Sequence, residues 1–178
     1  KTIRKGRGYI ADGILVEEPK EFTHNNAFPL TDQQRLLRAF IFPESVPVSQ
    51  RVNLSESDRK FALNVMSQYP RECQETSGNA IQKHRDTYGK PFLTWQEAPI
   101  RGTLRCYNKV GKAYGYLLDN AYIVDREHDV EFFLAAVIHT NANQIYNDDI
   151  YEYETIGEPF FKALGHAIYD HERQRQRK

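Results

Sequence analysis

Three runs rich in tyrosine, valine and isoleucine follow one another closely in the second half of the chain. They span residues 103–107, 113–124 and 130–140, and β-branched and aromatic residues of this kind favour strands. A polar stretch at 125–129 separates the last two runs. Because connections this short join antiparallel neighbours, the three runs predict a meander of antiparallel strands.

The segment before the strands carries apolar side chains at helical spacing. Thr31 and Gln34 have the spacing of a capping box, which predicts a helix over residues 31–41. Pro43 interrupts the pattern shortly afterwards. We expect a surface helix with one buried stripe, formed by Leu36, Leu37, Phe40 and Ile41.

A second helix is predicted between Ser55 and Pro70. Ser55 is a candidate N-cap, and Asp58 follows it at the spacing of a capping box. Pro70 ends the run because proline interrupts a helix. The predicted apolar face comprises Phe61, Ala62, Val65 and Met66.

A third helix is predicted near the C-terminus. It starts after Thr155 or Glu158 and runs toward the basic end of the chain. We expect it to pack across the sheet with an apolar face formed by Ile156, Phe160, Phe161, Leu164 and Ile168. The basic tail 173–178 is expected to be a solvated helix end that complements the helix dipole.

The chain has the size of one domain. With 178 residues and 40% hydrophobic content it can bury a core, and helices combined with an antiparallel sheet predict the α+β class. Asp12-Gly13 predicts a small hairpin or an extended loop over residues 8–16. The predicted parts are an extended or loop segment at 1–28, helices at 29–70, a connecting loop at 71–100 that includes Ser77-Gly78-Asn79, and strands with the last helix at 101–178.

Composition argues against several classes of partner. The 24 basic and 24 acidic residues cancel, so no net charge attracts the chain to nucleic acid or to an anionic membrane. No apolar run approaches the ~20 residues that a membrane span needs. His128 and His139 lack metal-ligand spacing, so we expect no metal and no cofactor. Cys73 and Cys106 form no disulfide framework, although one bridge between them stays open.

The chain contains, in order, LLRAFIFPESVP with LSESDRKFALNVMSQYPRE, then NKVGKAYGYLLDNAYIVD, then VEFFLAAVIHTNANQIYNDDIYEYETIGEPFFKALGHAIYDHE. Together these segments resemble the C-terminal part of bacterial serine hydrolases related to class A β-lactamases. The resemblance covers residues 22–172 and is most specific over residues 108–125. It implies one incomplete domain, in which residues 29–70 are part of a helical subdomain and residues 101–178 belong to the α/β subdomain.

The active site of that superfamily combines Ser-x-x-Lys, Ser-Asp-Asn and a Lys-Thr-Gly strand beside the nucleophile. Lys109-Val110-Gly111 is similar to the third element. The resemblance implies that the Lys109 ammonium faces the substrate carboxylate and that Gly111 lets the substrate backbone approach the strand edge. The backbone amide of Lys112 would then donate to the oxyanion, and losing such a donor costs on the order of 3 kcal/mol. Tyr114 follows the motif and would reach the substrate, unless it packs on the sheet.

Val110 is a departure from the family motif. The better-known motif has a hydroxyl residue there, which can bond a substrate carboxylate, whereas valine can only pack. The resemblance therefore places Val110 beside the substrate but favours a substrate other than a familiar β-lactam. For Lys109 itself, the alternative is a solvated strand lysine without a role in a site.

The nucleophile is missing. The sequence has no Ser-Asp-Asn, and its one Ser-x-x-Lys is Ser57-Asp58-Arg59-Lys60. The charged neighbours of Ser57 and the cap position of Ser55 favour a solvated helical turn. By the order of motifs in the family, the nucleophile helix and the Ser-Asp-Asn loop are expected before Lys1, and this chain alone is expected to be catalytically inert.

The resemblance also implies a partner. Strands from the preceding part complete the sheet in the related enzymes, so three C-terminal strands would leave an unpaired edge and an apolar face. We expect this surface to be covered by the missing N-terminal half or by another chain. A small-molecule or peptide-like acyl substrate is expected, and related hydrolases act in the bacterial periplasm or cell envelope.

The sequence leaves two possible functions. The first is the C-terminal portion of a serine acyl hydrolase, with Lys109, Gly111 and the Lys112 amide in its site. The second is a non-catalytic binding or scaffold protein that keeps a β-lactamase-like fold, which Val110 and the missing motifs favour.

Overall fold

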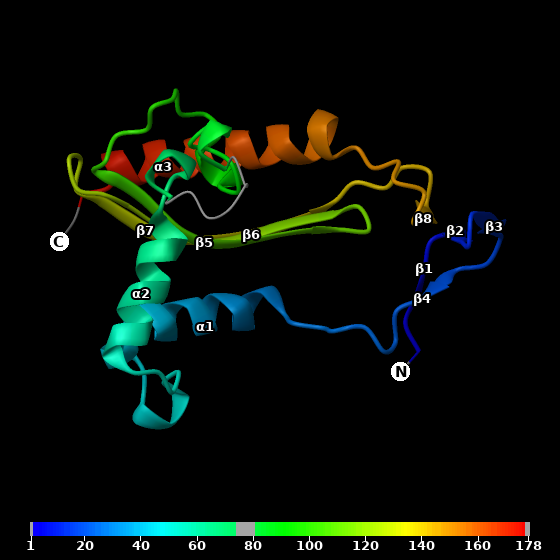
Figure 1. Cartoon of the computed structure of the whole chain (residues 1–178), viewed down its shortest axis with the longest axis horizontal. Helices are drawn as coiled ribbons and strands as arrows, with labels where there is room; N and C mark the ends of the chain where they lie inside the picture. The colour runs from blue at the N-terminus through cyan, green and yellow to red at the C-terminus, as the bar shows by residue number, and fades with distance from the viewer. Residues whose placement is uncertain (1, 74–80, 177–178) are drawn as a thin grey trace.

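The computed structural model describes residues 2–73 and 81–176 and has an α+β fold (Figure 1). Its central sheet has three antiparallel strands in the order β5-β6-β7. These are β5 (Leu104–Ala113), β6 (Tyr116–Asp125) and β7 (Val130–His139). The predicted meander of antiparallel strands is confirmed.

A two-residue turn joins β5 to β6. Tyr114 and Gly115 have φ values of 55° and 79°, and paired positive φ values match the right-handed twist of a hairpin. The prediction that the first strand ends at residue 107 and the second begins at 113 was wrong. Polar residues between these positions hid the strand pattern, and continuous pairing with β6 carries β5 to Ala113.

Helices α1 (Leu30–Ile41) and α2 (Glu56–Ser67) lie on the lower face of the sheet in Figure 1. Two 3-10 turns, η1 (Pro43–Ser45) and η2 (Val48–Gln50), connect them. The helices and this face of the sheet share one apolar cluster. Its buried members are Leu37, Ile41 and Tyr122, with Phe40, Phe42, Leu63, Met66, Tyr107, Val124 and Phe133 partly buried around them.

The helix signals were confirmed only in part. Ser55 caps α2 by accepting a hydrogen bond of 3.1 Å from the Asp58 backbone N–H. Thr31 does not cap α1, because the helix begins at Leu30 after Pro29 and has no side-chain cap. The predicted apolar faces also needed correction, since packing against the sheet selects Leu63 and Met66 on α2. Leu36, Phe61 and Val65 are exposed.

Helix α3 (Glu158–Gln174) lies on the upper face of the sheet in Figure 1, after a π-helical turn, η6 (Tyr153–Gly157). It packs against the 3-10 turn η5 (Pro91–Leu93) and forms the main core with the sheet. The predicted C-terminal helix is confirmed, but Gly165 and Tyr169 replace Ile156 and Phe160 on its buried face. The buried residues of this core are Tyr69, Phe92, Leu93, Ile100, Leu104, Cys106, Leu117, Ala121, Ile123, Val130, Phe132, Ala136, Phe161 and Tyr169.

The N-terminal segment forms two small sheets near the β5–β6 turn. Strands β1 (Arg4–Lys5) and β4 (Lys20–Glu21) pair antiparallel. The hairpin predicted around Asp12-Gly13 is confirmed, and both turn residues have positive φ. It consists of β2 (Gly8–Ala11) and β3 (Ile14–Val16), and β2 also pairs in parallel with β8 (Ile145–Tyr146).

The segment over residues 71–100 does more than connect two regions. It contains η4 (Ile81–Lys83) and the end of η3 (Pro70–Glu72), and it contributes Phe92, Leu93 and Ile100 to the main core. Its turn signal Ser77-Gly78-Asn79 lies outside the described residues.

Helices of this chain cover both faces of the β5-β6-β7 sheet, so the expectation of a bare apolar face was wrong. Among the described residues, β5 and β7 each pair with a strand on one side only, and on the outer edge of β5 the Tyr69 and Lys90 side chains bond the Leu104 and Cys106 carbonyl oxygens. Cys73 and Cys106 do not form the disulfide that the sequence left open, and the Cys73 thiol donates to the Tyr69 carbonyl oxygen at 3.6 Å. No helix in the described part of the chain is both long and apolar enough for a membrane crossing.

Gly165→Ala should destabilise the protein, although the same change usually stabilises a helix by about 0.5–1 kcal/mol. A Cβ at Gly165 would lie 2.1 Å from the Phe92 carbonyl oxygen, which belongs to the backbone of η5. We expect the free energy of unfolding to fall by about 1–3 kcal/mol in urea denaturation. An unchanged or higher value would contradict this contact, and Ala167→Gly on the exposed side is the matched control.

Candidate functional site

Lys109 lies near the middle of β5, the outer strand of the central sheet. Its side chain is exposed, and Nζ donates a hydrogen bond of 2.8 Å to the Val110 carbonyl oxygen. Asn120 of β6 is directly opposite in the register, and its side chain donates to the Gln33 carbonyl oxygen of α1. Because side chains alternate along a strand, Lys109 is on the sheet face that carries α1 and α2.

The next three residues have different surroundings. Val110 points to the other face, where it packs against the main core. Gly111 lies against Leu118, and a Cβ added there would approach the leucine side chain to 3.2 Å. The Lys112 ammonium is 3.8 Å from the Glu158 carboxylate and 4.4 Å from the centre of the Tyr153 ring.

Tyr114 lies in the β5–β6 turn, separated from Lys109 along the strand. At about 3.4 Å per residue, five residues separate the two backbones by roughly 17 Å. The Tyr114 ring contacts Phe22 edge-on at 5.4 Å between centroids, and the Tyr146 ring is 6.3 Å away. The structure therefore groups Tyr114 with the N-terminal segment and β8.

Ser57 and Lys60 lie on the exposed first turn of α2. Ser57 Oγ is 2.8 Å from the capping Ser55 Oγ, and Lys60 forms an ion pair of 2.8 Å with Glu56. Their surroundings are those of a solvated helix start.

The sequence did not indicate that Lys90 is buried next to Asn108, on the core face of the sheet. Lys90 is only 4% exposed, and Nζ donates to the Met66 and Cys106 carbonyl oxygens at 2.8 Å each. Its third hydrogen bond, of 3.2 Å, goes to Asn108 Oδ1. An ammonium has three N–H groups, so these acceptors use all of them. Burial lowers the pKa of Lys90, while the neighbouring Asp119 opposes this shift.

Asn108 links this lysine to a buried carboxyl group. Its Nδ2 donates to the Gly89 carbonyl oxygen at 2.8 Å and to Asp119 Oδ1 at 3.0 Å. Asp119 is 0% exposed, and its Oδ2 has no hydrogen-bond partner among the described residues. Burial raises the pKa of Asp119 to about 7, although Asn108 and the Lys90 charge oppose this rise. The Asp119 carboxyl group therefore changes between its protonated and ionised forms near neutral pH.

The sequence did contain a signal for these residues. Asp119 interrupts the apolar run LLDNAYIV at a position whose neighbours two residues away, Leu117 and Ala121, are in the core. A charged residue on the buried face of a strand needs partners. Lys90 gave no comparable signal, because a lysine between Gly89 and Pro91 reads as part of a loop.

A second buried carboxyl group anchors α3. Asp125 Oδ2 accepts hydrogen bonds from the Tyr169 hydroxyl at 2.6 Å and from Arg101 at 2.9 Å. His128 Nδ1 is also 2.9 Å from this oxygen. Burial alone would raise the pKa of Asp125, but Tyr169, His128 and Arg101 together lower it below its ordinary value. Although Glu127 and His128 are close enough to share a metal with Asp125, the Arg101 guanidinium already neutralises this carboxylate.

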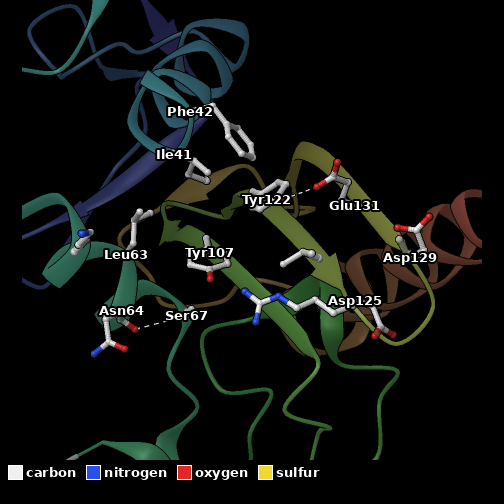
Figure 2. Close-up of a pocket in the computed structure, with 14 residues that line it drawn as sticks. Ile41, Phe42, Leu63, Asn64, Ser67, Tyr107, Tyr122, Asp125, Asp129 and Glu131 are labelled. Carbon is white, nitrogen blue, oxygen red and sulfur yellow. Dashed lines mark hydrogen bonds between the residues drawn. The ribbon is translucent and has the colours of Figure 1, made fainter. Parts of the chain in front are cut away.

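A cavity of about 690 Å³ lies between α1, α2 and the end of the sheet near the β6–β7 turn (Figure 2). Tyr122 lies on its floor and donates a hydrogen bond of 2.8 Å to Glu131 (Figure 2). The lining combines apolar side chains with charged ones of both signs. It consists of Ile41, Phe42, Lys60, Leu63, Asn64, Ser67, Tyr107, Tyr122, Val124, Asp125, Arg126, Asp129, Val130 and Glu131.

Comparisons with protein-family models, with curated proteins and with solved structures found no match for this chain. Its functional interpretation therefore depends on the geometry of its own residues.

Lys90→Met should lower the free energy of unfolding by about 1–3 kcal/mol, the cost of leaving buried hydrogen-bonding groups without a partner. Methionine fills similar space but leaves the Met66 and Cys106 carbonyl oxygens and Asn108 without their donor. Urea denaturation with Lys162→Met on the exposed side of α3 as control checks this. Equal, small losses in both variants would show that Lys90 carries no such role.

Proposed function

We propose that this chain is the C-terminal portion of a serine acyl hydrolase of the class A β-lactamase-like type. Lys109, Gly111 and the Lys112 backbone amide form the strand side of its acyl-transfer site. The nucleophile comes from another segment or another chain, because Ser57 is on a solvated helix start whose lysine pairs with Glu56.

The position of Lys109-Val110-Gly111 on an outer strand carries this proposal. Among the described residues, β5 has β6 on one side and no strand on the other. An open strand edge presents backbone N–H and C=O groups to which an extended peptide-like substrate can add. Gly111 leaves the least side-chain bulk at this edge, and the exposed Lys109 side chain can turn to a substrate carboxylate.

The environment of Val110 supports a structural reason for the departure from Lys-Thr-Gly. Its side chain packs against the main core, on the sheet face away from Lys109. A hydroxyl residue there would need a hydrogen-bond partner inside the protein. Recognition of a substrate carboxylate would then fall to Lys109 alone, which favours a substrate that differs from a familiar β-lactam.

The proposed chemistry assigns few tasks to this chain. The Lys109 ammonium binds and orients the acyl substrate through its carboxylate. When a serine Oγ attacks the acyl carbon, negative charge develops on the carbonyl oxygen, and the Lys112 backbone N–H donates to it. The proton from the serine passes to a base outside this chain.

Activity-based labelling tests the hydrolase proposal. A fluorophosphonate or fluorescent penicillin should leave this chain unlabelled and should label the polypeptide encoded by the complete gene at a Ser-x-x-Lys serine. In that polypeptide, Lys109→Ala should slow labelling by the anionic penicillin at least about tenfold, because hydrogen bonds to charged groups contribute about 1.5–3 kcal/mol. Lys162→Ala is the matched control. Labelling at Ser57, or none of the complete polypeptide, would sink the proposal.

The cavity below the sheet favours a second candidate, a binding protein without catalysis. Its volume of about 690 Å³ lies within the range of small-molecule sites, and an apolar floor with a few polar groups is typical of them. Lys109 is not among its lining residues, so binding there does not need the strand motif.

Titration with tyramine and with 4-hydroxyphenylacetate, followed by amide NMR, tests the binding candidate. Both compounds carry a phenol ring of the kind that packs against aromatic side chains such as Tyr107 and Tyr122. Their opposite charges distinguish binding to the acidic lining residues Asp129 and Glu131 from binding to the basic ones, Lys60 and Arg126. We expect one compound to shift the signals of Leu63 and Tyr122, with the shifts lost in Tyr107→Ala. Absence of shifts with both compounds at millimolar concentration would contradict the candidate.

A further inference from the structure

We propose that Asp119, Asn108 and Lys90 form a proton-linked positioning device that orders the outer strand β5 at Lys109-Val110-Gly111. Strand order does not require hydrolase activity, so the device stands independently of the proposed reaction. Its parts are one buried carboxyl group, one buried amide and one buried ammonium, all on the sheet face opposite Lys109.

The device holds the backbone of Lys109 through the residues on either side of it, Asn108 and Val110. Val110 is directly opposite Asp119 in the register, and Asn108 is its diagonal neighbour on the same face. Residues 108 and 110 therefore contact the buried face, whereas Lys109 between them points the other way. The backbone position of Lys109 consequently depends on how firmly these two neighbours are held.

The orientation of Asn108 is locked by its partners. Its Oδ1 accepts from the Lys90 ammonium, and its Nδ2 donates to Gly89 and Asp119. A flipped amide would place N–H groups against the ammonium and an oxygen against two other oxygens. Asn108 thus ties β5 to β6 and to the segment before η5 in one arrangement only.

The ionised form of Asp119 has too few hydrogen-bond donors in this arrangement. Stabilising donors are the Asn108 side chain and the Asn120 backbone amide, and Oδ2 has no hydrogen-bond partner among the described residues. Buried carboxylates of low pKa accept two or three hydrogen bonds. Lys90 cannot supply the missing bond, because its three N–H groups are already used.

Few charged groups act on Asp119 from the surrounding elements. Lys90 acts from the segment before η5 and Lys109 from the opposite face of the sheet, and both charges favour the ionised form. Cys106 of β5 stays neutral, since burial raises the pKa of its thiol to about 12. Strand β7 places Ala136 opposite Asp119. The side chains that η5 and α3 contribute to the core on this face carry no carboxylate or ammonium group. They are Phe92, Leu93, Phe161, Leu164, Ile168 and Tyr169.

These surroundings determine the sign of the pH effect. Burial raises the pKa of Asp119 from its ordinary value of 3.8 to about 7 in the folded protein. The folded state therefore binds more protons than the opened state between about pH 4 and 7, and stability falls as pH rises through this window. Above pH 7 the loss is complete. Because β5 pairs with a strand on one side only, we expect the free energy of local opening of β5 to fall as Asp119 loses its proton.

Amide hydrogen exchange at pH 5.5 and pH 8 on the whole chain tests the device. After correction for intrinsic exchange rates, protection of the β5 amides at Lys109 and Gly111, which pair with β6, should fall at least about tenfold at the higher pH, and that of Leu164 in α3 should change less. Asp119→Asn should abolish the pH dependence in β5. Asp149→Asn in an exposed loop is the matched control and should retain it.

Carbon-13 NMR titration of the wild-type Asp119 carboxyl group gives a second measurement that needs no variant. A transition near pH 7 is expected. A transition at or below pH 5 would overturn the device, as would equal pH dependence of protection in β5 and α3, or its persistence in Asp119→Asn. Each of these readings is independent of whether a probe labels the complete polypeptide.

Discussion

The turn at Tyr114 and Gly115 fixes the register of β5 against β6, and the rest of the structure depends on that register. Both residues have positive φ, and the resulting two-residue hairpin places Val110 opposite Asp119. A slip of one residue would move every side chain of β5 to the other face. Asn108 would then leave the buried network, and Lys109 would point into the core.

Given this register, the two faces of the sheet have separate tasks. The upper face holds the main core with α3 and η5, and it also holds the buried group of Lys90, Asn108 and Asp119. The lower face carries α1, α2, the cavity and the exposed side of β5. Both faces bury apolar side chains, but the buried network that orders β5 is on the upper face, while the cavity and the exposed Lys109 side chain are on the lower face. Strand β5 is therefore held by buried side chains on one face and exposes Lys109 on the other.

Local signals in the sequence predicted several elements correctly. The Ser55 cap, the Asp12-Gly13 hairpin and the C-terminal helix each depend on nearby residues, so they could be read directly. The α1 capping box at Thr31 failed because Pro29 already sets the helix start. Phe61 belonged to a predicted buried face yet is 71% exposed, because the sheet contacts a different side of α2.

The sequence alone determined the α+β composition, the order of the strands and the presence of a Lys-x-Gly stretch in a strand region. Periodicity and turn chemistry act over a few residues, which is why they can be read from one chain. Only the tertiary structure decided that β5 is an open edge and that Lys90 meets Asn108, 18 positions later, and through it Asp119. Burial and pairing across such distances set the protonation of Asp119, and these depend on which segments pack together.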